Sequence, residues 1–127
     1  MAKPRYDDLK SFLADRFGDS LRWVASFDSD SYTYNVRWIR DDLKTDLSNF
    51  DFDTIVHRSM AVFNRRHVED VYFHLGDANS LVIEHERATA VHVYVDDSRG
   101  VVIKLEPDAS VTIPEFRTEC LSELGVE

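Results

Sequence analysis

The spacing of apolar residues divides the chain into helical and extended segments. After Pro4, apolar side chains recur at intervals of three and four residues up to Gly18. This spacing predicts a helix that begins near a proline and ends at a glycine. Its buried face would carry Tyr6, Leu9, Phe12, Leu13 and Phe17.

The period then changes to two residues. Leu21, Trp23, Ala25 and Phe27 alternate with other side chains, and the turn-forming residues 28–31 follow. A second alternating run contains Tyr32, Tyr34, Val36 and Trp38. Two such runs across a short polar turn predict an antiparallel hairpin.

The second half of the chain predicts a helix, three strands and another helix. A helix should begin near Asp51 as its N-cap and run towards Arg65, whereas residues 67–75 fit either a helix end or a short strand. A turn at 76–79 precedes strands expected at about 81–86, 90–95 and 101–105, with a hairpin turn at 96–100. Thr112 and Glu115 resemble a capping box for a last helix. Its apolar positions are Ile113, Phe116, Cys120, Leu121 and Leu124.

This order of elements predicts a single α+β domain over residues 1–127. A five-stranded antiparallel sheet flanked by helices, in the order α-β-β-α-β-β-β-α, would bury the apolar faces economically.

Charge suggests where the protein works. The chain has four Lys, eleven Arg, sixteen Asp and eight Glu, and its net charge is -9. Few lysine stems and many hydrated carboxylates are typical of a cytoplasmic protein from a salt-loving archaeon, because molar salt screens the repulsion among like charges. The alternative is an ordinary acidic protein. The N-terminus lacks a signal-like apolar stretch, and no apolar run is long enough for a membrane span, so we expect a cytoplasmic protein without membrane contact.

The residue pattern does not indicate catalysis. His74, His85 and His92 could meet around a metal, but their spacing is not that of a ligand motif. Asp96 and Asp97 fit a turn better than an acid–base pair. Cys120 stands in an apolar stripe and should be buried. We therefore expect no enzyme activity, no cofactor and no metal site.

Two features interrupt the acidic composition and are candidate partner-binding sites. One is the basic cluster Arg58, Arg65 and Arg66, whose simpler role would be to complement the C-terminal dipole of a helix. The other is the aromatic hairpin, with Trp23, Tyr34 and Trp38, which would otherwise form core. The net charge disfavours nucleic acid as a partner.

Three segments resemble a small uncharacterised family from halophilic archaea. They are residues 19–32, 38–43 and 100–105, in which Arg40, Asp41 and Asp42 form the most local signature. The family has no assigned activity, so the resemblance implies no functional residue. Arg40 to Asp42 could instead cap the short helix that follows.

The order of elements is also similar to that of the roadblock (dynein light-chain) family and of profilin-like folds. That similarity implies a homodimeric scaffold or regulator, for example of a small GTPase or a cytoskeletal or signalling protein, whose sheet extends across the dimer. The alternative is a PAS-like small-molecule sensor with a pocket lined by Trp23, Tyr34 and His92.

Overall fold

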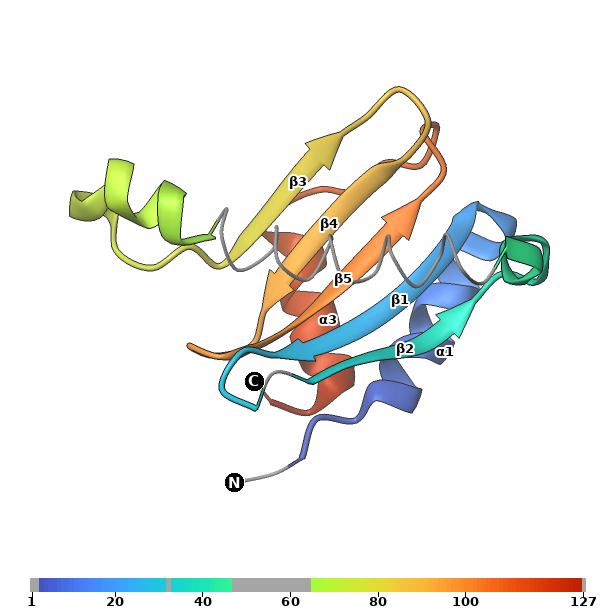
Figure 1. Ribbon diagram of the computed structural model, residues 1–127, viewed down its shortest axis with the longest axis horizontal. Helices are drawn as coiled ribbons and strands as arrows, with labels where there is room; N and C mark the ends of the chain where they lie inside the picture. The colour runs from blue at the N-terminus through green and yellow to red at the C-terminus, as the bar shows by residue number, and fades with distance from the viewer. Residues whose placement is uncertain (1–2, 32, 47–64, 127) are drawn as a thin grey trace.

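The strands that the two-residue period predicts form one antiparallel sheet in the computed structural model, which describes residues 3–31, 33–46 and 65–126 (Figure 1). The strands are β1 (Leu21–Asp28), β2 (Thr33–Ile39), β3 (Ser80–Glu84), β4 (Thr89–Tyr94) and β5 (Arg99–Leu105). They lie in the order β2-β1-β5-β4-β3, so β2 and β3 are the edges. The predicted fold class is confirmed, and the strand boundaries differ from the prediction by only a few residues.

Two helices lie side by side on one face of the sheet, which we call the first face (Figure 1). They are α1 (Tyr6–Phe17) and α3 (Glu115–Leu124). Their contact includes an edge-to-face pair of Phe17 and Phe116, with ring centroids 5.8 Å apart. Beneath them, the buried residues of the first cluster include Leu9, Leu13, Leu21, Val24, Val91, Val93, Ile103, Cys120 and Leu124.

The opposite face, the second face, carries a second buried cluster. It contains Trp23, Ala25, Phe27, Tyr94 and Val102, so β1 is buried on both sides. His92 and Tyr94 both lie on β4 and are buried on this face. Neighbours directly across the ladder project from the same face, and the partner of His92 on β5 is the buried Val102.

The segment before β3 resolves the ambiguity at 67–75. Residues 65–71 are helical, and a 3₁₀ turn, Phe73–Leu75, follows them. Gly76 has a φ of 85°, a conformation that glycine adopts without strain, and there the chain leaves the turn. The predicted helix start at Asp51 lies outside the described residues.

The start of α3 corrects the predicted capping box. Pro114 occupies the N-cap position, and no side chain caps the helix. Thr112 contributes its carbonyl oxygen instead, which accepts a 2.8 Å hydrogen bond from the Phe116 N–H. Ile113 therefore precedes the helix and is exposed, outside the buried stripe that it was predicted to join.

Gly100 is not the turn residue that the sequence suggested, because it lies inside β5. The turn before it is organised by Asp96, whose Oδ1 accepts hydrogen bonds from the N–H groups of Ser98 at 3.0 Å and Arg99 at 2.7 Å. A Cβ at Gly100 would lie 2.6 Å from Phe27 Cζ and 2.8 Å from the Val93 carbonyl oxygen. Glycine is needed there for close packing and not for turn geometry.

Candidate partner-binding surface

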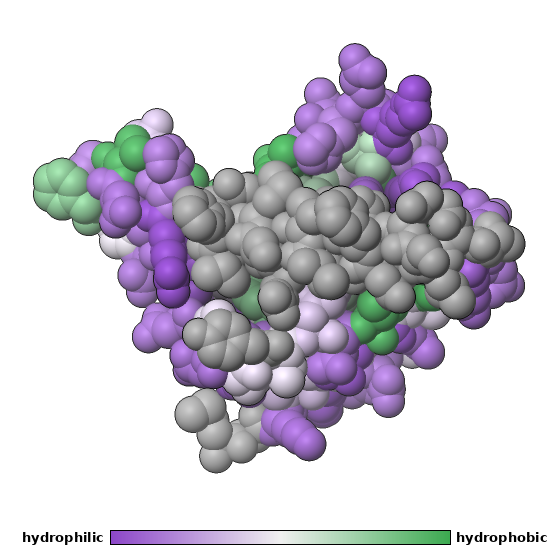
Figure 2. Space-filling view, viewed as in Figure 1, coloured by the Kyte–Doolittle hydropathy of each residue, from purple (hydrophilic) through white to green (hydrophobic). Residues whose placement is uncertain are grey.

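An apolar projection stands at the end of the sheet where β3 begins. It comprises Val71, Tyr72, Phe73 and Leu75, which we call the 71–75 patch. Phe73 is 81% exposed and Leu75 is 69% exposed. Figure 2 shows hydrophobic side chains gathered on this lobe at the left of the molecule. Single exposed apolar residues are ordinary on protein surfaces, but a contiguous group of large ones marks an interaction site.

The edge strand β3 follows the patch after the short loop 76–79. Among the described strands, only β4 pairs with β3, so the outer backbone edge of β3 has no ladder partner in that part of the chain. Val82, at the centre of β3, is 44% exposed. An edge strand of this kind offers a row of backbone donors and acceptors to another strand.

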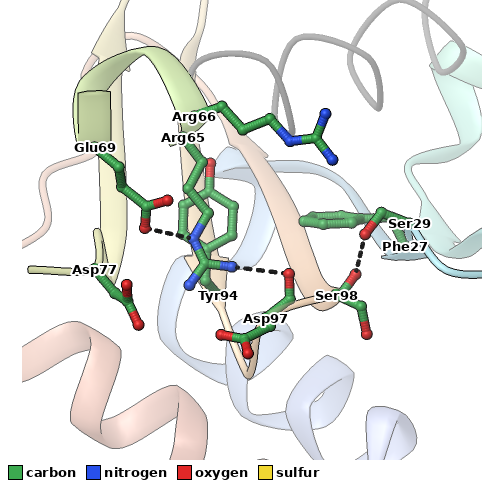
Figure 3. Close-up of a pocket in the computed structure, with 9 residues that line it drawn as sticks. All are labelled: Phe27, Ser29, Arg65, Arg66, Glu69, Asp77, Tyr94, Asp97 and Ser98. Carbon is green, nitrogen blue, oxygen red and sulfur yellow. Dashed lines mark hydrogen bonds and ion pairs between the residues drawn. The ribbon is translucent and has the colours of Figure 1, made fainter. Parts of the chain in front are cut away.

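Arg65 fixes the base of the projection to the body of the protein (Figure 3). Its Nη1 donates to the carbonyl oxygen of Asp96 at 2.8 Å, and its guanidinium lies 4.5 Å from the centroid of the Tyr94 ring. Its Nε lies 3.3 Å from Glu69 Oε2, which also accepts a 2.8 Å hydrogen bond from the Ala78 N–H. Arg65 thus joins helical segment 65–71 to the β4–β5 turn, while Glu69 holds the loop that leads to β3.

The cavity around Arg65 is small and of mixed charge. It has a volume of about 200 Å³, and Phe27 and Tyr94 are its aromatic residues. Asp77 and Asp97 line it together with Arg66, an exposed residue that points away from Arg65 (Figure 3). Burial raises the pKa of the Tyr94 hydroxyl above its usual value, so Tyr94 stays neutral at physiological pH.

The structure separates the predicted partner-binding residues. Trp23 is only 2% exposed and packs in the second cluster, so in this conformation its side chain is almost inaccessible to a partner. Tyr34 is partly buried against that cluster, and Trp38 packs against the first cluster on the other side of the sheet. The aromatic hairpin therefore serves mainly as core. Of the basic cluster, Arg65 makes internal contacts, Arg66 is exposed, and Arg58 lies outside the described residues.

The Arg40–Asp42 signature has a structural role. Arg40 Nη1 donates to Glu106 Oε1 at 2.8 Å and to the Asp19 carbonyl oxygen at 2.7 Å, while its Nε donates to Asp42 Oδ1 at 2.6 Å. Arg22 Nη1 donates to the same Glu106 oxygen at 2.9 Å. Burial alone would raise the pKa of Glu106, but the two guanidinium groups outweigh it and lower that pKa. The signature ties the end of β2 to the ends of β1 and β5.

The groups considered for chemistry are apart from one another. His74 and His85 are exposed whereas His92 is buried, and no three His, Cys, Asp or Glu side chains gather as metal ligands in the described part of the chain. Cys120 is buried, as predicted, and burial raises the pKa of its thiol to about 12. A thiol with that pKa is a poor nucleophile at neutral pH. No helix within the described ranges is long and apolar enough to cross a bilayer.

The architecture is that of a roadblock-like domain. The structure is similar to the Roadblock/LC7 domain from Streptomyces avermitilis, with a TM-score of 0.59 over 92% of this chain and 86% of that one, at 13% sequence identity. By sequence, the chain belongs to the family described as a domain of unknown function (DUF7522), which matches residues 7–125. No curated protein matches the chain. The expected roadblock-like topology and membership of an uncharacterised family are confirmed, and the similarity at this identity concerns the fold alone.

The 71–75 patch was missed at the sequence level. Val71, Tyr72, Phe73 and Leu75 are nearly consecutive, so they match neither a helical nor a strand period. A usable signal was present, because residues 71–83 contain one formally charged side chain, Asp77, in a chain with 31% charged residues. Depletion of charge is a property of interface cores.

Proposed function

We propose that the protein is a non-catalytic interaction module that acts as a homodimeric scaffold or regulator in a high-salt cytoplasm. The single observation that carries the proposal is the exposed 71–75 patch beside the edge strand β3. Tyr72 is about half exposed, like Val71, and Phe73 and Leu75 are more so. Fully burying one side chain of this size stabilises a complex by about 1.5–3 kcal/mol.

The geometry of β3 suits pairing with a second copy of the chain. A twofold axis at Val82 would place the strand Ser80–Glu84 antiparallel to its own copy and leave five strands on each side of a continuous sheet. An apolar, charge-depleted surface also lets two chains of net charge -9 approach with their carboxylates elsewhere. In molar salt, the Debye length of about 3 Å screens the remaining repulsion.

The test is the molar mass in solution. Size-exclusion chromatography with light scattering in molar KCl should give twice the 14.7 kDa mass of the chain. Phe73→Asp and Val82→Lys should each shift the protein towards monomer, because each places a charge in the proposed interface. Val36→Lys is the matched control, since Val36 is about as exposed as Val82 but lies on β2, at the opposite edge of the sheet. A wild-type protein that stays monomeric at high concentration would overturn the dimer.

The alternative of a PAS-like sensor has less support. Trp23, Tyr34 and His92 project from the same face of the sheet, as the strand register requires. Trp23 is packed among Ala25 and other members of the second cluster, so it belongs to the core. His92 lines a cavity of about 300 Å³, and neither Trp23 nor Tyr34 is among the described residues that line that cavity.

A further inference from the structure

A hollow in the second face is lined by residues at and beside the connection between β3 and β4. That connection is the loop at the top of the sheet in Figure 1. The volume of the hollow is about 300 Å³, at the small end of the range for ligand sites. The hollow arises because side chains of unequal size lie in a row across three strands. Ile83, Ala90 and Lys104 lie directly opposite one another, and the middle residue supplies only a methyl group.

The connection completes the apolar floor of the hollow. Ala88 lines the hollow beside Ala90, and both alanines are buried. The His85 N–H donates a 2.8 Å hydrogen bond to the Ala88 carbonyl oxygen, which closes the turn. The hollow is therefore built by regular backbone structure and by two small residues, and not by a loop alone.

The described residues that line the hollow are basic where they carry charge, whereas the chain as a whole is acidic. The nitrogen-bearing residues of the lining are His85, Arg87, His92 and Lys104, and none of the described lining residues carries a carboxylate. The chain as a whole has 24 acidic residues against 15 Lys and Arg. Glu84 does not enter the hollow, because its ladder neighbours are Thr89 and Leu105 on the other face of the sheet. A basic rim around an apolar floor is complementary to an anion attached to an apolar body.

We propose that this hollow binds a small carboxylate with an apolar chain or ring. The apolar part would lie against Ala88, Ala90 and Ile83, and the carboxylate would lie at the rim near Lys104 and Arg87. Charge-assisted contacts of this kind are stronger than neutral ones and give the site its preference for an anion. The inference goes beyond the proposed dimer and does not depend on it, because it concerns a face of the sheet and not the edge of β3.

Octanoate is a suitable probe, with 1-octanol and acetate as the two controls that lack the charge and the apolar chain respectively. Calorimetry on the whole protein in molar KCl, with octanoate up to about 10 mM, would register even millimolar affinity. Methyl NMR should show octanoate-dependent shifts at Ala88 and Ala90. We expect octanoate to bind more tightly than either control.

Two variants test the two parts of the site. Lys104→Gln should weaken octanoate binding about tenfold, the size expected for loss of one charge-assisted contact. Ala90→Leu should fill the hollow and remove binding, and circular dichroism would check that it folds. Lys44→Gln is the matched control, because Lys44 is exposed, pairs with Asp41 and is not among the residues that line the hollow. It should leave binding unchanged.

Four results would overturn the proposal. They are no octanoate binding, equal binding of octanol or acetate, methyl shifts confined to other parts of the protein, and equal effects of Lys104→Gln and Lys44→Gln. Because the molar mass can be followed in the same samples, failure of the ligand site is distinguishable from failure of the dimer.

Discussion

A methyl group added at Gly100 should destabilise the centre of the sheet. In Gly100→Ala, the new Cβ would meet Phe27 Cζ at 2.6 Å, Phe27 Cε1 at 2.9 Å and the Val93 carbonyl oxygen at 2.8 Å. Carbon atoms pack best about 3.5–4.0 Å apart, so the ring would have to move by roughly 1 Å. Phe27 is buried and packs edge to face on Tyr94, with centroids 6.2 Å apart, and the Val93 oxygen belongs to the backbone of a central ladder.

The magnitude follows from two opposing effects. Overpacking a filled site costs about 1–3 kcal/mol. Replacing glycine by alanine also restricts the unfolded chain, which offsets about 0.4–1 kcal/mol of that cost. The net loss in the free energy of unfolding should be about 1–2 kcal/mol, or a fall in Tm of roughly 3–8 °C for a chain of this size.

Urea denaturation followed by tryptophan fluorescence in molar KCl would measure this loss, at one fixed protein concentration because a dimer's stability depends on it. The double variant Gly100→Ala/Phe27→Leu removes part of the clash with the ring but keeps the clash with the Val93 oxygen. It should be more stable than the sum of the single changes predicts by at least about 0.5 kcal/mol. A neutral or stabilising Gly100→Ala would refute the reasoning, since it would mean that the ring and the strand yield without cost.

Two further predictions concern charge. The pKa of Glu106 is lowered in the folded protein, so its ionised form adds stability above the unfolded pKa, and this stability is lost as the pH falls through the folded pKa. Glu106→Gln should therefore lower the free energy of unfolding at neutral pH by about 1 kcal/mol and make that free energy depend less on pH in the acid range. If the free energies of unfolding of the wild type and the variant instead change in parallel with pH, the role of the Arg22–Arg40–Glu106 network is contradicted. The Lys-poor, Asp-rich composition leads us to expect loss of structure on dialysis into dilute buffer; an unchanged circular dichroism spectrum would falsify the high-salt interpretation.

The elements with a clear local period could be predicted from the sequence. The predicted helix over Tyr6–Phe17 matches α1, and the hairpin runs match β1 and β2, because alternating or helical spacing reflects the faces that these segments bury. The pattern on β1 could not show how deeply each face is buried. All residues from Trp23 to Phe27 are buried, so both faces of this central strand are covered. The alternation of residue types therefore does not separate a buried face from an exposed one.

The candidate site was less predictable because it depends on contacts between distant segments. The sequence predicts that Arg65 complements a helix dipole or binds a partner, yet its side chain donates to carbonyl oxygens of the β4–β5 turn about thirty residues later in the chain. The hollow beside Ala90 likewise depends on the register that sets Ile83 and Lys104 on either side of it. The local spacing of apolar residues does not show which strands pair, or where a small residue on one strand leaves space between larger residues on its neighbours.

The central position of β1 and β5 has a consequence for biosynthesis. Val24 pairs with Ile103, and the whole ladder joins residues 21–28 to residues 99–105. A ribosome therefore releases the first hairpin several seconds before the strand that covers its inner edge. During that interval, β1 presents an unpaired edge and two apolar faces, which are the features that chaperones recognise and that lead to aggregation. Slow closure of this one ladder, more than the formation of any helix, should set the folding rate of the domain.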